Sequence, residues 1–446
     1  MAVKANTNTS DDRQKQSQEV ASGQAKSVVY THDPQRVVED IRDQLAAADK
    51  PLAFLFGAGT SGVNIAPDPP PGQKRKVIPL IPGIGGLTDQ CRNTVCALGK
   101  KHKEAWSNLE QHCKEESRFV NIENILSTIQ TRIEGMGASD QLSGLTKAEW
   151  KDVEKSIRQA IAKAVLLEGK TIPDHMPQDD FASWVSRCER SLPLEIFTIN
   201  YDVLIERSLE RAGVPLFDGF VGAYEPFFCP DSLERTELCS SPRWTRLWKI
   251  HGSVNWQLKK RQAGVQVIRT QPSTTGEMIL PSRLKYDESR KMPYTAMLDL
   301  LARTVDRDAS VLMTCGYSFG DEHVNSTIFT ALDNMRRAHV IALMHDALTP
   351  DADVVRRAQA RPNFVVVGPN GGVIKGQWAE WRLLSPVDAS THSYMDLSWD
   401  SQAAPEQGKG AADPDNPSLQ GQMKLGDFEW FCKFLLTIAR ESGDET

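Results

Sequence analysis

The segment LAFLFGAGTSG, residues 52–62, decides the fold class of this chain. Its first five residues form a short apolar run that predicts a buried strand entering a tight loop. The stretch from Gly57 to Gly62 matches the pattern Gly-x-Gly-x-x-Gly, in which glycines let backbone amides approach a pyrophosphate. A plain strand-to-helix turn would need the same residues, so the pattern alone leaves both interpretations open.

The dehydrogenase version of this pattern carries an acidic residue about 20 positions later, at the end of a second strand. Residues 66–76 instead contain four prolines and Gly72, and this composition predicts an irregular loop. An ordinary dehydrogenase half-site therefore does not fit the segment.

Further apolar runs predict a sheet. They are Leu194–Ile199, Leu247–Ile250, Val311–Thr314, Val340–Met344 and Phe364–Val367. Helical segments such as 203–211 and 325–337 separate several of them. Short apolar strands that alternate with helices indicate a parallel sheet covered on both faces, which is an α/β, Rossmann-like fold. Such sheets bind ligands beyond the carboxyl ends of their strands.

Composition shifts divide the chain. Residues 1–27 predict a disordered polar tail without the apolar stretch of a signal peptide. Residues 28–400 would form the main domain, with a helical insertion at about 87–190. A linker over 401–420 precedes a C-terminal helix within 421–446, whose apolar side chains need a surface on this chain or on a neighbouring subunit.

The overall composition narrows the function classes. The chain has 446 residues, of which 40% are hydrophobic and 25% are charged, an ordinary globular balance. A net charge of -6 lacks the basic surface that wrapping nucleic acid requires. The longest apolar runs fall short of the roughly 18 residues that a membrane span needs.

Eight cysteines are scattered through the chain with no Cys-x-x-Cys pair. This spacing predicts free thiols in a reducing, cytoplasmic setting rather than a disulfide framework. It also predicts no structural zinc, whose ligands come in closely spaced pairs.

Two further strand ends carry polar residues suited to catalysis. Thr198, Asn200 and Asp202 follow the run that begins at Leu194, and their carboxamide and carboxylate can converge on one ligand. Capping of the next helix by Asn200 or Asp202 is the structural alternative. His251, at another strand end, titrates near neutral pH and can take a proton from a hydroxyl group or water.

A fourth strand end reads Cys315-Gly316-Tyr317-Ser318-Phe319-Gly320-Asp321-Glu322-His323. Gly316 and Ser318 suit close approach to a ribose or a phosphate. Asp321 suits a helix cap.

In order, these four segments resemble the sirtuin family: Gly-Ala-Gly-x-Ser, Thr-x-Asn-x-Asp, His-Gly-Ser and Gly-x-Ser. The stretches 200–202, 249–256 and 316–323 are more similar to its bacterial sirtuin-like branch in anti-phage defence. The resemblance covers roughly residues 52–370, and the helical segment is an insertion within it. It implies an NAD-binding α/β fold.

The resemblance also assigns roles. Gly57, Ala58, Gly59 and Ser61 would line the pyrophosphate, and Gly316 and Ser318 would contact the adenosine side. Thr198, Asn200 and Asp202 would surround the nicotinamide ribose. Asn200 would orient the ribose or a water molecule, and His251 would accept the proton. Preorganised dipoles would stabilise the oxocarbenium-like state.

A sirtuin deacylase would normally carry two Cys-x-x-Cys pairs, whereas Cys229 and Cys239 are ten residues apart. The resemblance therefore favours an NAD glycohydrolase that depletes NAD in anti-phage defence (abortive infection). An NAD-dependent protein deacylase and a non-catalytic module that senses NAD or ADP-ribose are the alternatives.

The motifs end near residue 370, and the remainder is too short for a further sensor domain. The chain thus resembles stand-alone members paired with a HerA-type ATPase in a large assembly. The expected partners are NAD, other copies of this chain and such an ATPase, with nucleic acid reached only through the partner.

Overall fold

The computed structural model describes residues 31–65, 78–116, 118–234, 241, 244–262, 264–278, 292–387, 392–403 and 419–441. The predicted tail, the proline-rich loop at 66–76 and most of the predicted linker lie outside these residues. The chain divides into two compact units, Met1–Thr31 and His32–Thr446, and the architecture below is that of the second.

A ten-stranded sheet forms the centre of the described fold. Its strands, in spatial order, are β1 (Thr31–His32), β20 (Gln377–Trp381), β19 (Gly371–Ile374), β18 (Phe364–Val367), β17 (His339–Leu343), β16 (Val311–Cys315), β2 (Leu52–Phe56), β7 (Glu195–Thr198), β11 (Thr245–Lys249) and β8 (Leu216–Phe217). Neighbours from β18 to β8 pair in parallel, whereas β19 and β20 form an antiparallel extension. The predicted α/β class is confirmed, and the antiparallel extension is an addition to it.

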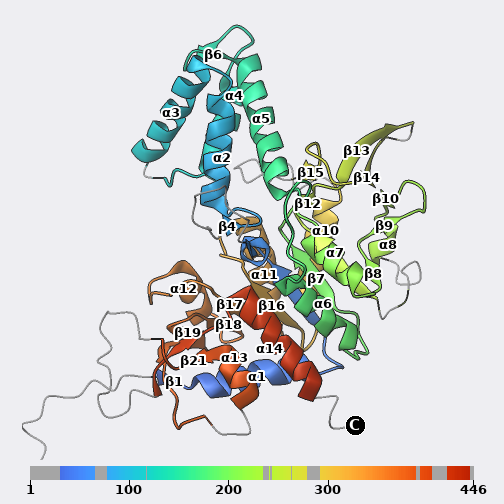
Figure 1. Ribbon diagram of the computed structural model, residues 1–446, viewed down its shortest axis with the longest axis vertical. Helices are drawn as coiled ribbons and strands as arrows, with labels where there is room; N and C mark the ends of the chain where they lie inside the picture. Colours follow the sequence, from blue (N-terminus) through green and yellow to red (C-terminus); the bar gives the residue numbers. More distant parts are fainter. Residues whose placement is uncertain are drawn as a thin grey trace, which may run out of the picture. The chain divides into compact units, whose positions relative to one another are not determined.

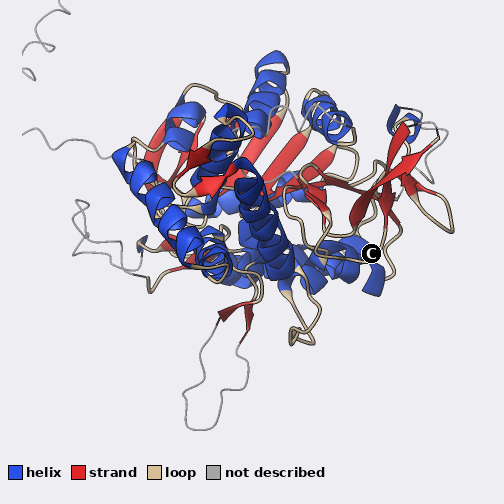
Figure 2. Cartoon of the chain, turned by 90° about the horizontal axis from the view of Figure 1, so that it is seen from above, coloured by secondary structure: helices blue, strands red, loops and turns tan. Residues whose placement is uncertain are grey.

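Helices cover both faces of this sheet, as Figure 2 shows. Strand β2 divides its side chains by alternation: positions 52, 54 and 56 enter one hydrophobic cluster, and positions 53 and 55 enter the other. The first cluster includes side chains of α1 (Pro34–Ala46), α6 (Pro177–Arg187), α13 (His392–Ser398) and α14 (Phe428–Glu441). The second includes those of α10 (Tyr294–Val305), α11 (Glu322–Asn334) and α12 (Asp353–Gln359).

Four helices form a separate module within the unit (Figure 1). They are α2 (Ile84–Cys96), α3 (Lys100–Glu115), α4 (Ile122–Gly135) and α5 (Lys147–Val165). Trp106 and Trp150 are buried in its core, and Thr146 and Glu149 make a capping box at the start of α5. The cluster also contains Leu204, from the start of α7 (Leu204–Arg211). The module therefore packs directly beside a strand-end loop of the sheet.

A small antiparallel sheet lies outside the expectations from sequence (Figure 1). Its strands are β13 (Trp256–Arg261), β14 (Gly264–Arg269), β10 (Phe227–Phe228) and β9 (Phe220–Val221). The buried ring of Trp256 lies 5.1 Å from the ring of Phe220 and anchors the sheet to the main core.

The remaining described elements are short. They are η1 (Ala58–Ser61), α8 (Asp231–Glu234) and the pairs β3 (Asn64–Ile65) with β4 (Ile78–Pro79), β5 (Gln141–Leu142) with β6 (Leu145–Thr146), β12 (Gly252–Ser253) with β15 (Glu277–Met278), and β21 (Trp399–Asp400) with β22 (Gln422–Met423). Among the helices described, none is both long and apolar enough to cross a membrane.

The strand order contains a point at which the chain changes direction. From β2 the chain passes outward through β7 to β11, and it then returns to add β16, β17 and β18 on the other side of β2. After β2 the chain continues to β7 and after β16 to β17, so the connections from these two neighbouring strands run toward opposite edges of the sheet. Open α/β sheets bind ligands at such a switch point.

Candidate functional site

The glycine loop after β2 packs against the loop after β16 at the switch point. Gly59 donates its backbone N–H to the carbonyl of Gly316 at 3.0 Å, and a Cβ at Gly59 would lie 2.7 Å from the Gly316 Cα. Gly316 has a φ of 66°, and a Cβ there would lie 2.6 Å from the amide nitrogen of Thr60. Both loops need glycine because their backbones touch.

Asn200 is fixed by the glycine loop. Its Nδ2 lies 2.9 Å from the carbonyl oxygen of Gly57, 3.1 Å from Thr60 Oγ1 and 2.7 Å from Ser61 Oγ, so its two hydrogens are shared among these three acceptors. A carbonyl oxygen only accepts, so the amide nitrogen must face Gly57. Its backbone amide donates to Thr198 Oγ1 at 3.0 Å. Within the described part of the chain nothing donates to Asn200 Oδ1, which can therefore serve a ligand.

Asp202 has two structural roles. Its Oδ2 accepts a hydrogen bond from Ser61 Oγ at 2.6 Å, and its Oδ1 accepts one from the amide of Leu204 at 3.0 Å. The residue at the N-cap of α7 is Val203, whose side chain makes no cap hydrogen bond, so one oxygen of Asp202 supports the first amide of the helix from one position before the cap. The other oxygen completes a chain of hydrogen bonds from Asn200 through Ser61 to Asp202.

Lys249 stabilises the loop that carries Asp202, a role that the sequence did not suggest. Its ammonium donates to the backbone carbonyl of Asp202 and, at 2.8 Å, to Oε1 of Glu206. The Lys249 side chain is 4% exposed. Burial raises the pKa of Glu206, against the opposing effect of Lys249. A lysine within the otherwise apolar run Leu247–Ile250 was the available signal, since such a charge needs a partner.

His251 and Asp321 form a buried pair. The His251 Nε2 lies 3.2 Å from the Asp321 Oδ2, and the two side chains are 8% and 6% exposed. Asp321 Oδ1 also accepts hydrogen bonds from the amides of His323 and Val324, so the predicted cap at the start of α11 is present as well.

The location of this pair follows from the strand order. His251 follows β11 and Asp321 follows β16, and strands β2 and β7 lie between them in the sheet. The pair must therefore cross the carboxyl ends of β2 and β7, where the glycine loop and the Asn200 loop begin.

The structure brings together most of the residues proposed from sequence. Hydrogen bonds and close backbone contacts join Gly57, Gly59, Ser61, Asn200, Asp202, Thr198 and Gly316. Ala58 and Gly59 are exposed on the loop surface. Ser318 is exposed and outside this network. Ser61 is buried and serves Asn200 and Asp202 rather than the cavity described next.

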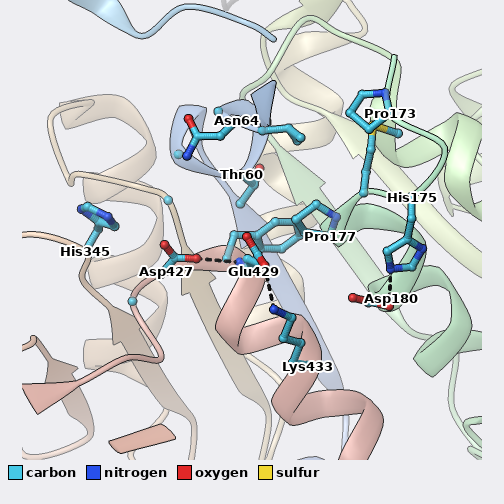
Figure 3. A pocket seen from close by; sticks show the side chains of 17 residues that line it. Thr60, Asn64, Pro173, His175, Pro177, Asp180, His345, Asp427, Glu429 and Lys433 are labelled. Carbon is cyan, nitrogen blue, oxygen red and sulfur yellow. Dashed lines mark hydrogen bonds and ion pairs between the residues drawn. The ribbon is translucent and has the colours of Figure 1, made fainter. Parts of the chain in front are cut away.

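A cavity of about 430 Å³ opens beside the glycine loop. Gly59, Thr60, Gly62 and Gly316 line one side of it, and the segment from Gly426 to Glu429 lines another. Figure 3 shows Thr60 and Asn64 above the first turn of α14. Sequence reasoning missed the C-terminal contribution, because more than 350 residues separate Gly426 from the glycine loop.

Within the described ranges of the chain, no three His, Cys, Asp or Glu side chains gather closely enough to hold a metal ion. Cys239 lies outside the ranges.

Comparison with known families agrees with this geometry. Residues 194–366, less than half of the chain, match the family model described as SIR2-like domain. The match begins at β7 and contains Asn200, His251 and Asp321. Over this stretch the chain is similar to a SIR2-like domain, a class whose members generally use NAD and are enzymes. No curated protein matches the chain.

Proposed function

We propose that this protein is an NAD glycohydrolase that cleaves the bond between nicotinamide and ribose. The observation that carries the proposal is the fixed orientation of Asn200. Its Nδ2 is held by Gly57 and Ser61, so that Oδ1 is left for a ligand. A second polar group comes from the buried His251–Asp321 pair. His251 follows β11, the neighbour of the strand β7 that precedes Asn200, and its imidazole can exchange a proton. Binding alone would not require such a group.

In the proposed reaction a water oxygen attacks C1′ of the nicotinamide ribose as the C1′–N bond breaks. The bonding electrons leave with neutral nicotinamide, and the products are nicotinamide, ADP-ribose and a proton. Asn200 Oδ1 orients the water or a ribose hydroxyl group. His251 accepts the proton, and Asp321 stabilises the resulting imidazolium.

The substrate would lie across the switch point. The pyrophosphate follows the exposed edge of the glycine loop at Ala58 and Gly59, and the nicotinamide ribose lies toward Asn200 and His251. This arrangement is supported by the short hydrogen bonds that join the glycine loop to Asn200.

A protein deacylase and a sensor remain the competing functions. The sequence lacks the Cys-x-x-Cys pairs that sirtuin deacylases normally carry. Purified protein is incubated with NAD, and nicotinamide and ADP-ribose are measured with and without an acylated peptide. Release without peptide supports the hydrolase, and release only with peptide supports the deacylase. No release under either condition, or with a candidate partner ATPase, contradicts both and supports the sensor.

We further propose that NAD depletion by this protein serves anti-phage defence in the cytoplasm, in an oligomer paired with a HerA-type ATPase. The proposal rests on the motif resemblance. The C-terminal helix is docked on its own core, since Phe431, Phe434 and Leu435 are fully buried. The helical module is therefore the better candidate for assembly contacts.

The helical module has two features that suit a regulatory surface. Phe119 is 86% exposed, and Leu98 is 46% exposed. Tyr201 and Val203, on either side of Asp202, pack against the module core. A partner that binds the module could thus change the position of the loop that carries Asn200 and Asp202. Mass measurement of the protein alone and with the ATPase tests the assembly, and a monomer that ignores the ATPase contradicts it.

A further inference from the structure

The C-terminal segment forms a wall of the cavity beside the glycine loop. Gly426 lies against the end of β17, where a Cβ at Gly426 would be 2.8 Å from the amide nitrogen of His345. Its carbonyl also lies 3.9 Å from the Cys315 Sγ at the end of β16. These contacts fix the first turn of α14 above the carboxyl ends of two strands.

The position of the cavity identifies the part of the dinucleotide that would enter it. Thr60 and Gly316 line the cavity, whereas Asn200 and His251 do not. With the nicotinamide ribose at Asn200 and the pyrophosphate on the glycine loop, the other end of NAD points toward β16 and β17. The cavity would therefore receive the adenosine.

Three carboxylates line the cavity, those of Asp180, Asp427 and Glu429, together with one lysine, Lys433, and two histidines, His175 and His345. Asp180 pairs with His175 at 2.9 Å, and Glu429 pairs with Lys433 at 2.7 Å. Asp427 also lines the cavity, and no described cation lies within ion-pair distance of its carboxylate. One of its oxygens accepts the amide of Glu429 at 2.8 Å, which leaves the other for a ligand (Figure 3).

We infer that Asp427 selects an adenosine whose 2′-hydroxyl is free and rejects one that carries a 2′-phosphate. A carboxylate accepts hydrogen bonds from ribose hydroxyl groups. It repels a phosphate dianion. Among the described lining residues, Lys433, His175 and His345 each already pair with a carboxylate, those of Glu429, Asp180 and Asp346. The site thus prefers NAD to NADP. This inference rests on the proposed function, because the proposed function orients the dinucleotide.

Asp427 lies at an unusual position in the chain for a carboxylate that binds the adenosine ribose. Dinucleotide-binding sheets usually place such an acid about 20 residues after the glycine loop. Here the loop at that distance is rich in proline, and the carboxylate comes from the first turn of the last helix. The C-terminal helix would then be part of the specificity site and not only of the core.

The test uses AMP, ADP and adenosine 2′,5′-bisphosphate. AMP and adenosine 2′,5′-bisphosphate differ only in the 2′-phosphate, and the comparison of ADP with AMP gives the effect of the length of the 5′-phosphate chain. Their binding to the full chain is measured by calorimetry, which requires no NAD turnover. We expect the 2′-phosphate to weaken binding to the wild-type protein by at least about tenfold. Asp427→Asn should reduce that penalty by on the order of tenfold, because the neutral side chain no longer repels the phosphate.

Asp33→Asn is the matched control. Asp33 caps α1 through the same type of contact, with Oδ1 accepting the amide of Gln35 at 3.2 Å, and it does not line the cavity. Asparagine is a good cap, so both variants should fold, and their melting temperatures verify this. The control should retain the wild-type selectivity.

Two results would overturn the inference. One is a wild-type protein that binds the 2′-phosphorylated nucleotide as tightly as AMP, which would indicate that Lys433 dominates the wall. The other is an Asp427→Asn variant with unchanged selectivity. Loss of the proposed function would look different: the wild-type protein would retain the nucleotide selectivity but release no nicotinamide from NAD.

Discussion

Replacement of Lys249 by methionine should destabilise the protein strongly and in a pH-dependent way. The change removes the cation from a buried pair in which Lys249 is 4% and Glu206 is 15% exposed. It also leaves the Asp202 carbonyl without its donor. Breaking one side of a buried ion pair costs about 3–5 kcal/mol, which is a large part of the stability of an ordinary domain.

The pH dependence follows from the raised pKa of Glu206. A carboxyl group with a higher pKa in the folded state binds a proton more readily there than in the unfolded chain, so stability falls as the pH rises above about 4.5. Lys249 opposes this rise in pKa. Its loss should therefore leave a deficit that is largest at pH 7 and shrinks toward pH 4. The remainder, about 1–3 kcal/mol, is the cost of the unpaired Asp202 carbonyl.

Urea unfolding followed by tryptophan fluorescence at pH 4 and pH 7 measures the deficit. The double variant Lys249→Met with Glu206→Gln should recover most of the loss at pH 7, since it removes the buried charge as well. Lys259→Met is the control, because Lys259 pairs with Glu225 at the surface and should lose less than about 1 kcal/mol. If Lys249→Met loses no more stability than this control at pH 7, the buried pair of Lys249 and Glu206 does not stabilise the fold as proposed.

Two further substitutions test the contacts at the switch point. Asp321→Asn keeps the cap of α11 but removes the anion beside His251. NAD turnover should therefore fall about 100-fold or more, with little change in the free energy of unfolding. An unchanged rate and pH–rate profile would contradict the pairing of His251 with Asp321. Gly316→Ala adds both backbone strain and a clash with Thr60, whereas the control Gly213→Ala has a similar φ of 70° and open space around it. The first should cost clearly more stability than the second, whose strain is about 1–3 kcal/mol, and equal losses in urea unfolding would argue against the loop contact.

The strands of the sheet could be predicted from the sequence because they are buried on both faces. Runs such as those at Leu52 and Phe364 are continuous and apolar, and the structure places β2 and β18 at the predicted residues. The candidate site residues in the loops that follow could be predicted for a related reason, since polar residues at strand ends differ clearly from their apolar neighbours. Parallel pairing then gathers them at one edge of the sheet.

Other parts carry weaker local signals. The hairpin β13–β14 projects Leu258 and Val265 into solvent at 55% and 63% exposure, so its alternation does not reveal a buried face. Gly372 lies in β19, where a Cβ would be 2.5 Å from the carbonyl of Val366, although glycine usually argues against a strand. The insertion predicted at about 87–190 includes α6, but Phe181 and Trp184 of that helix pack in the core of the sheet.

The C-terminal wall of the cavity could not be predicted for a different reason. Asp427 and Gly426 meet the glycine loop only through the tertiary fold, and no local pattern connects positions so far apart in the chain. The His251–Asp321 pair has the same origin, since strands β2 and β7 separate the two strands that carry it.

The proposed function assigns the cleavage of NAD, without a protein substrate, to Asn200 and His251. Its most direct test is nicotinamide release from NAD alone, with the candidate partner ATPase present, by the wild-type protein and by Asn200→Ala and His251→Ala. We expect release by the wild-type protein and at least about 100-fold slower release by each variant, with both variants folded as judged by thermal unfolding. Near-normal release by both variants would contradict the assigned site.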